Sequence, residues 1–135
     1  MVIKAKLIPL SMVRCDTVIE DKRTGKKSLV GLFNNITVAK APCTHPRLNV
    51  FISLTEGNGD YVGRLRCIKE GDEQEIFAME GQVRFSNPRQ ILEYNFEIIG
   101  MAFPDFGNYR FEFLCNNELV IARKFMVSEQ RENIK

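Results

Sequence analysis

Apolar and polar side chains alternate with a period of two along several segments of this chain, and this pattern constrains the fold more than any other. Residues 92–98 alternate between apolar side chains and Glu or Asn, and residues 48–55 and 109–113 have the same period. Successive side chains of a β-strand point to opposite faces, so each segment predicts a strand with one apolar face. Three such strands predict an antiparallel sheet with one face toward water.

The segment 104–111 adds a second constraint, because it reads Pro-Asp-Phe-Gly-Asn-Tyr-Arg-Phe between two alternating segments. This sequence is close to the corner before strand F of an immunoglobulin-like sandwich, where a tyrosine hydroxyl binds nearby backbone. We therefore expect Asp105, Gly107 and Tyr109 to form a structural corner. Together with turn signals at short spacing, the pattern predicts an all-β, immunoglobulin-like antiparallel sandwich of about eight strands.

Length and charge limit the other possibilities. A chain of 135 residues is long enough for one domain with its own core. We predict a single β-sandwich domain over residues 1–127 and a polar C-terminal tail over residues 128–135. The formal net charge is only +2, which argues against a nucleic-acid-binding surface. No apolar run approaches the length of a membrane span, so no membrane partner is expected.

The cysteines and the N-terminus bear on the compartment. The four cysteines contain no CxxC pair, and free thiols of this kind suit a reducing compartment; they are Cys15, Cys43, Cys67 and Cys115. A disulfide between Cys67 and Cys115 is the alternative. The apolar residues 7–13 are interrupted by Pro9, which is a poor signal-peptide core. We therefore predict a cytoplasmic protein.

Two patterns could hold a metal ion, and both lack ligands. Cys43 and His45 would need a second ligand pair at short spacing, so a proline-flanked loop over residues 40–47 is the simpler interpretation. The segment 56–60 begins like a calcium loop, but Tyr61 and Cys67 stand where glycine and glutamate are required. No metal and no cofactor is predicted.

Two charged patterns also have simpler structural explanations. Four basic residues crowd the turn at residues 21–27, which favours a solvated hairpin tip over a nucleic-acid contact. Glu93 and Glu97 line one strand face with Asn95 between them. Alternate residues on such a face lie about 7 Å apart, a step within the range of glycoside-hydrolysing carboxylates. No cleft is indicated there, and outward glutamates are usual on a solvated sheet. No catalytic residue is predicted.

Loop lengths predict two hairpins. The four-residue loop 57–60 would pair residues 48–55 with residues 61–69. That register puts Phe51 opposite Arg66 on the outer face, beside Arg64. Because aromatic and arginine side chains dominate interface hot spots, we predict Phe51, Arg64 and Arg66 as partner contacts, with a self-contained cation–π pair as the alternative.

The last hairpin turns at Asn116 and Asn117. We expect it to pair Phe113 with Ile121 and Tyr109 with Phe125. An inward-leaning Arg123 then lies opposite Phe111, with its charged head at the sheet rim.

Several segments together resemble those of an uncharacterised bacterial domain family of small single-domain proteins. The matching segments are residues 24–33, 53–57, 83–88 and 103–112. The resemblance implies a self-standing β-sandwich with no known activity, so it transfers no functional residue.

A sandwich without a catalytic constellation predicts a non-catalytic module that recognises another protein, or a second copy, through a sheet face or an exposed edge strand. The alternative is a carbohydrate- or small-ligand-binding domain that uses the end loops, with Tyr61 or Phe106 exposed there. A third hypothesis, hydrolysis, requires distant carboxylates, or Cys43 and His45, to meet in a pocket.

Overall fold

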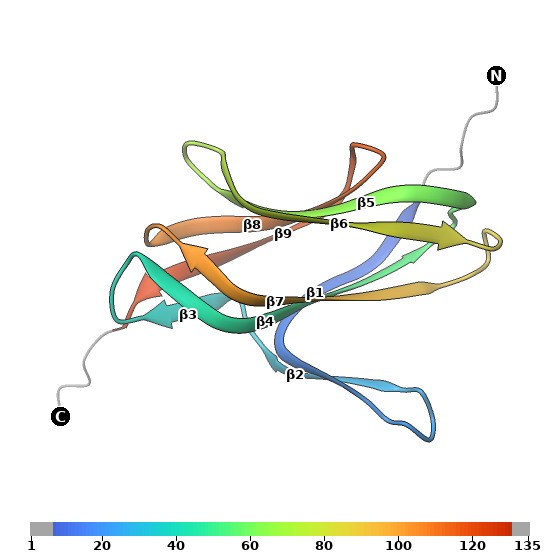
Figure 1. Ribbon diagram of the computed structural model, residues 1–135, viewed down its shortest axis with the longest axis horizontal. Coiled ribbons are helices and arrows are strands. Elements are labelled where there is room, and N and C mark those ends of the chain that lie inside the picture. The colour runs from blue at the N-terminus through green and yellow to red at the C-terminus, as the bar shows by residue number, and fades with distance from the viewer. Residues whose placement is uncertain (1–6, 131–135) are drawn as a thin grey trace.

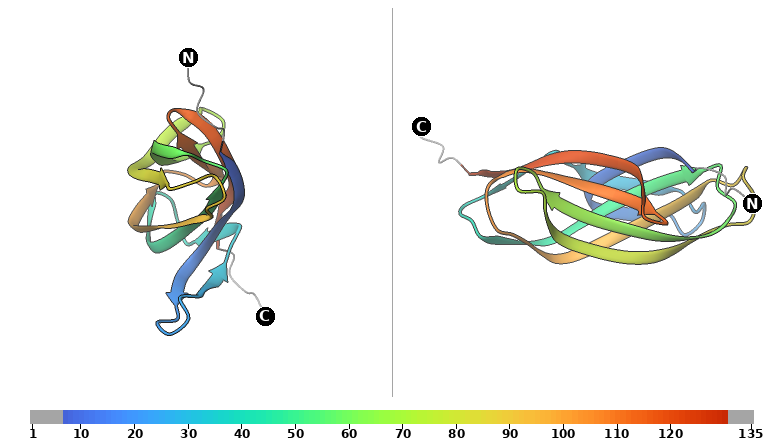
Figure 2. Two further views of the ribbon diagram at one scale, coloured as in Figure 1. Left: turned by 90° about the vertical axis from the view of Figure 1, so that its right-hand side faces the viewer. Right: turned by 90° about the horizontal axis from the view of Figure 1, so that it is seen from above.

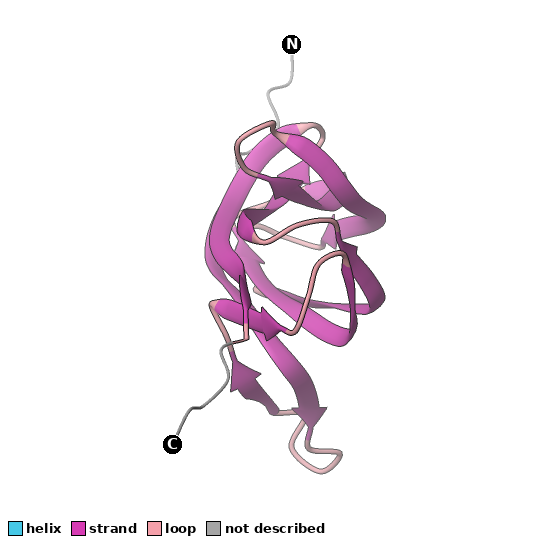
Figure 3. Ribbon diagram, turned by 90° about the vertical axis from the view of Figure 1, so that its left-hand side faces the viewer, coloured by secondary structure: helices cyan, strands magenta, loops and turns pink. Residues whose placement is uncertain are grey.

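The computed structural model describes residues 7–130, which form nine β-strands and no helix (Figures 1 and 3). The first sheet has the order β2-β1-β4-β7 and consists of β1 (Ile8–Glu20), β2 (Lys27–Leu32), β4 (Cys43–Thr55) and β7 (Leu92–Phe103). The second sheet has the order β3-β9-β8-β5-β6 and consists of β3 (Asn35–Val38), β5 (Gly59–Lys69), β6 (Gln74–Phe85), β8 (Gly107–Cys115) and β9 (Glu118–Glu129). The two sheets lie one over the other (Figure 2). The predicted all-β fold of two packed sheets is confirmed, with nine strands where about eight were expected.

The core lies between the sheets and follows the alternation in the sequence. The inward residues of β4 are completely buried; they are Leu48, Val50, Ile52 and Leu54. On β8 the inward aromatic rings of Tyr109 and Phe111 stack on Phe125 of β9, and the ring centroids of Phe111 and Phe125 are 5.0 Å apart. Each such side chain contributes about 2 kcal/mol by leaving water, so this aromatic cluster holds the second sheet against the first.

The turn before β8 is tied down by Tyr109. Its hydroxyl donates a 2.6 Å hydrogen bond to the carbonyl oxygen of Asp105, and the residue is fully buried. Gly107 begins β8 with a φ of +135°, a conformation that side-chain-bearing residues rarely adopt. The corner residues therefore fix how the chain enters the strand that carries the aromatic core.

The hairpin predicted between residues 48–55 and 61–69 is wrong. β4 pairs with β1 and β7 in the first sheet, whereas β5 pairs with β6 and β8 in the second. The connection crosses from one sheet to the other at the end of the core, where a Cβ on Gly57 would overlap the side chains of Leu7 and Phe85. Glycine is needed here because the backbone itself packs against the core.

The register predicted for the last hairpin is confirmed. Phe113 lies opposite Ile121, Tyr109 opposite Phe125, and Arg123 opposite Phe111. β9 continues to Glu129 and pairs in parallel with β3, so the sheet includes the first two residues of the segment predicted as a tail. Residues 131–135 of that segment lie outside the described residues.

Candidate functional site

The structure does not bring the three predicted partner contacts together. Phe51 lies on β4 of the first sheet, whereas Arg64 and Arg66 lie on β5 of the second. Phe51 is also only 6% exposed. A joint patch of Phe51 with the two arginines is therefore absent, because the loop that was expected to pair their strands crosses between the sheets.

Arg64 and Arg66 instead belong to a network of ion pairs on the outer face of the second sheet. Arg64 makes two 2.9 Å hydrogen bonds to Glu75, and Arg66 lies 2.7 Å from Glu112. Arg110 bonds Glu112 at 2.6 Å and reaches Glu73 through two further 2.9 Å bonds. Each arginine of this network already has a carboxylate partner.

Glu112 is the centre of the network. Burial by itself would raise the pKa of this carboxyl, but hydrogen bonds from Arg110 and Arg66 outweigh burial and hold its pKa below the ordinary value. The pKa of Arg110 is raised by its hydrogen bonds to Glu73 and Glu112. These guanidinium groups are structural cations that are engaged within the sheet.

The most prominent surface feature is the hairpin of β1 and β2, which extends beyond the two-sheet body (Figures 1 and 2). We call residues 16–32 the arm. Lys27 on the arm lies 3.2 Å from Glu93 on the outer face of the first sheet. One face of the arm is therefore turned toward that sheet.

The opposite face of the arm is apolar and exposed. Lys27 and Leu29 lie on the face of β2 that is turned toward the sheet, whereas Val30 and Leu32 lie on the opposite face. Ile19 of β1 lies opposite Ser28 and therefore shares the face of Val30 and Leu32. The exposed fractions are 52% for Ile19, 48% for Val30 and 65% for Leu32. Single exposed apolar residues are common, but three on one face of a projecting hairpin form a continuous apolar surface.

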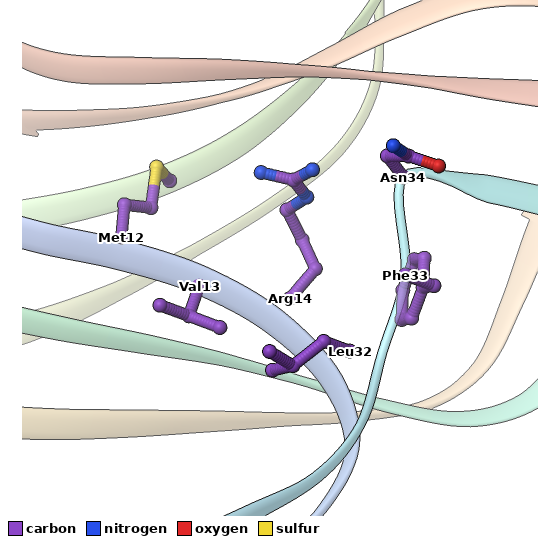
Figure 4. A pocket seen from close by; sticks show the side chains of 6 residues that line it. All are labelled: Met12, Val13, Arg14, Leu32, Phe33 and Asn34. Carbon is purple, nitrogen blue, oxygen red and sulfur yellow. The ribbon is translucent and has the colours of Figure 1, made fainter.

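A pocket of about 350 Å³ lies at the root of the arm, where the chain leaves β2 for β3 (Figure 4). It is lined by Met12, Val13, Arg14, Leu32, Phe33 and Asn34. The backbone positions the pocket: Phe33 N–H donates to the carbonyl of Arg14, and Met126 N–H on β9 donates to the carbonyl of Asn34. The pocket therefore joins the edge of the first sheet to the edge of the second. We call it the root pocket.

Arg14 is the charged group of the root pocket, and it has no acidic partner among the described residues. It lies opposite Val50 in the β1–β4 register, so it occupies an inward position on β1. Its Nε atom is buried without a hydrogen-bond partner among residues 7–130. Burial lowers the pKa of this guanidinium, and the nearby charge of Arg123 lowers it further. Arg123 donates only to the neighbouring carbonyl of Ala122.

Sequence reasoning placed Arg123 at an inward position but missed Arg14. The available signal was the same for both, namely an arginine at a core-facing position of a strand. Arg14 escaped notice because residues 8–20 do not alternate cleanly, and its inward direction is defined only by pairing with β4.

The other suspected groups are placed as follows. Cys43 and His45 both lie on β4, where Cys43 packs against the core and the His45 ring lies 6.4 Å from the ring of Phe33. Tyr61 is buried and its hydroxyl accepts a hydrogen bond from the Asn58 amide, whereas Phe106 is exposed. Tyr61 also lines a pocket of about 380 Å³ together with Gln82 and Asn116, so ligand binding at the end loops stays a prediction.

The described part of the chain contains no group of three or more His, Cys, Asp and Glu side chains arranged to hold a metal ion. Residues 7–130 also contain no helix of the length and hydropathy that would span a bilayer. None of the four cysteines, which all lie within residues 7–130, forms a disulfide, so the alternative bond between Cys67 and Cys115 does not form.

Comparison with known proteins places the chain in a family. Residues 10–128, which are most of the chain, match the model of DUF6941, a family of unknown function. No curated protein matches the chain. The resemblance to an uncharacterised domain family is thereby confirmed. The chain belongs to DUF6941.

Proposed function

We propose that this protein is a non-catalytic β-sandwich module that pairs with a second copy of itself through β2 of the arm. The observation that carries the proposal is the exposed apolar face of the arm next to an open strand edge. β2 is an end strand of its sheet, and within residues 7–130 no strand pairs with its outer edge. An open edge with apolar side chains is a template for strand addition.

A two-fold arrangement suits the sequence of β2. An antiparallel pair of β2 strands centred on Val30 sets Val30 opposite its own copy and Leu32 opposite Ser28 on the apolar face. In this register the two Lys27 side chains are about six residues, or about 20 Å, apart along the strands. Apolar side chains meet at the centre and like charges are separated.

The competing surface is the outer face of the second sheet, and its chemistry favours the arm. A partner that docked on Arg64, Arg66 or Arg110 would have to displace carboxylates that already bind them at 2.6–2.9 Å. Exchange of one ion pair for another brings little net free energy. The arm has no such internal partner on its apolar face.

Two further features complete the proposal. We assign an immunoglobulin-like topology, supported by the parallel pairing of β3 with β9 and by the hydrogen bond from Tyr109 to Asp105 before β8. We assign a cytoplasmic location, supported by four cysteines that form no disulfide, of which Cys15, Cys67 and Cys115 are buried.

Sedimentation velocity of the full chain over micromolar to submillimolar concentrations tests the pairing. We expect a reversible dimer for the wild type and a monomer for Val30→Lys, because a charge at an edge strand opposes pairing. Val62→Lys is the matched control, since Val62 is an equally exposed apolar strand residue outside the arm. A wild type that stays monomeric, or a Val30→Lys variant that still dimerises, would overturn the proposal.

A further inference from the structure

The root pocket contains a cation that the fold does not neutralise. The inward positions of β4 and of β8 are filled by apolar side chains, whereas Arg14 is an arginine at an inward position of β1. A guanidinium group in such a place loses water contacts and gains nothing in return unless an anion binds it. Arg14 has no ion pair among residues 7–130, and its Nε donor is buried without an acceptor.

A second cation makes the site more positive. Arg123 comes from β9 of the other sheet, faces the same interior side through its register with Phe111, and has a hydrogen bond only to a backbone carbonyl. In contrast, the arginines of the outer-face network are all bonded to glutamates; they are Arg64, Arg66 and Arg110. The difference between the two groups of arginines is the absence of carboxylates at the root pocket.

We propose that the root pocket binds a small ligand whose oxyanion, a carboxylate or a phosphate, lies against Arg14 and within the field of Arg123. A guanidinium group matches either oxyanion because its planar donors form paired hydrogen bonds. Arg14 lines the pocket, and no carboxylate among residues 7–130 binds its guanidinium group.

The remaining walls define the rest of the ligand. Leu32, Phe33 and Met12 provide an apolar surface, and the side-chain amide of Asn34 extends from the wall beside Arg14 (Figure 4). A volume of about 350 Å³ lies within the range of small-molecule pockets, which is roughly 300–1,000 Å³. The pocket therefore suits an anion attached to a small apolar or aromatic body. This site shares Leu32 with the edge of β2 that we propose for pairing, but Arg14 and Asn34 lie outside that edge.

Benzoate is a suitable probe because it joins a carboxylate to an aromatic ring, and benzamide is its uncharged counterpart. We expect titration of the full-length protein with benzoate, followed by nitrogen–proton NMR, to shift the Arg14 Nε–H signal and the Phe33 and Asn34 amides with saturation. Inorganic phosphate in a parallel titration shows whether the site also takes that oxyanion. Sodium chloride at matched ionic strength controls for screening.

Arg14→Gln is expected to weaken benzoate binding about tenfold or more, because a charge-assisted hydrogen bond is lost. Arg84→Gln is the matched control, since Arg84 is an exposed arginine that pairs with Asp60 away from the pocket. Val30→Lys should bind benzoate normally, which separates this site from self-pairing.

Three results would overturn the proposal. The first is equal shifts with benzoate and benzamide. The second is an equal loss of binding in Arg14→Gln and Arg84→Gln. The third is no saturable shift with either benzoate or phosphate in a wild type that is folded by its amide spectrum.

Discussion

The outer face of the second sheet and the root pocket both contain arginines, but only the outer face supplies carboxylates for them. Arg66 and Arg110 share Glu112, whose side chain is only 8% exposed, and Arg110 also binds Glu73. Arg14 is partly buried and has no acidic partner within residues 7–130. The same residue type therefore stabilises one region and costs free energy in the other.

This difference distinguishes a structural charge from a charge available to a ligand. Arg64 and Arg66 were predicted from the sequence as partner contacts, because they occupy a face that points to water. Judged by position alone, the outer face would therefore be the better binding surface. The hydrogen bonds reverse that ranking, because an arginine that already binds two carboxylates has few N–H donors left for a ligand. Stability measurements on matched variants test this difference between the two regions.

The largest effect is expected from Glu112→Gln. Loss of the shared carboxylate leaves Arg66 and Arg110 close together without their common partner, which should lower the free energy of unfolding by about 3 kcal/mol. Urea unfolding at neutral pH measures this change. Glu80→Gln is the control, because Glu80 is an exposed carboxylate of the same face, and its effect should be within error. Equal effects of the two variants would show that the buried position of Glu112 is unimportant.

Replacing arginine by methionine in the two regions should change the free energy of unfolding in opposite directions. Arg110→Met deprives Glu112 of one cation and should destabilise the protein by about 2 kcal/mol. Arg14→Met keeps the stem but removes a desolvated charge, so we expect a stabilisation of about 1 kcal/mol in the absence of ligand. Thermal and urea unfolding of both variants would decide. Destabilisation by both would mean that Arg14 is held by the fold as firmly as Arg110.

Low pH should reduce the contribution of the Glu112 network to the free energy of unfolding, whereas the root pocket has no carboxylate in its lining to titrate. Because the pKa of Glu112 is lower in the folded state than its ordinary value of 4.5, its contribution is complete above about pH 4.5. That contribution is lost as the pH falls through the folded pKa. The stability gap between wild type and Glu112→Gln should therefore narrow between pH 6 and pH 3, by an amount smaller than the Glu112→Gln effect itself. A gap that is independent of pH would contradict this account.

Local alternation predicted the core-facing residues of β4, β7 and β8, because a period of two needs only neighbouring residues. The four-residue loop before β5 was misread, since its length is compatible with a hairpin and with a crossing to the other sheet. Packing of Gly57 against Leu7 and Phe85 decides between them, and Leu7 is fifty residues away in the chain. Contacts of this kind cannot be read from a single segment.

The root pocket was less predictable than the core for a related reason. Its residues come from β1, the end of β2 and the β2–β3 connection, and the second cation, Arg123, comes from β9. Arg123 could be placed at an inward position because its hairpin register is local. The direction of Arg14 depends on its pairing with Val50 of β4. The outer face of the first sheet also differs from the prediction that it is exposed to water. Asn49 on this face is buried, and its side-chain amide donates a hydrogen bond to the carbonyl oxygen of Asp16.

The smallest effects on the free energy of unfolding are expected for single ion pairs on the outer face of the second sheet. Arg64 binds Glu75 through two 2.9 Å bonds, whereas Arg84 binds Asp60 through one bond between two highly exposed side chains. A double-mutant cycle should give a measurable coupling for Arg64 with Glu75, smaller than the Glu112→Gln effect, and a coupling near zero for Arg84 with Asp60. Paired bonds hold the two side chains in one geometry, whereas a single exposed bond competes with water. Equal coupling energies for the two pairs would show that paired hydrogen bonds do not strengthen an ion pair on this face. The large effect expected for Glu112 would then be due to its burial.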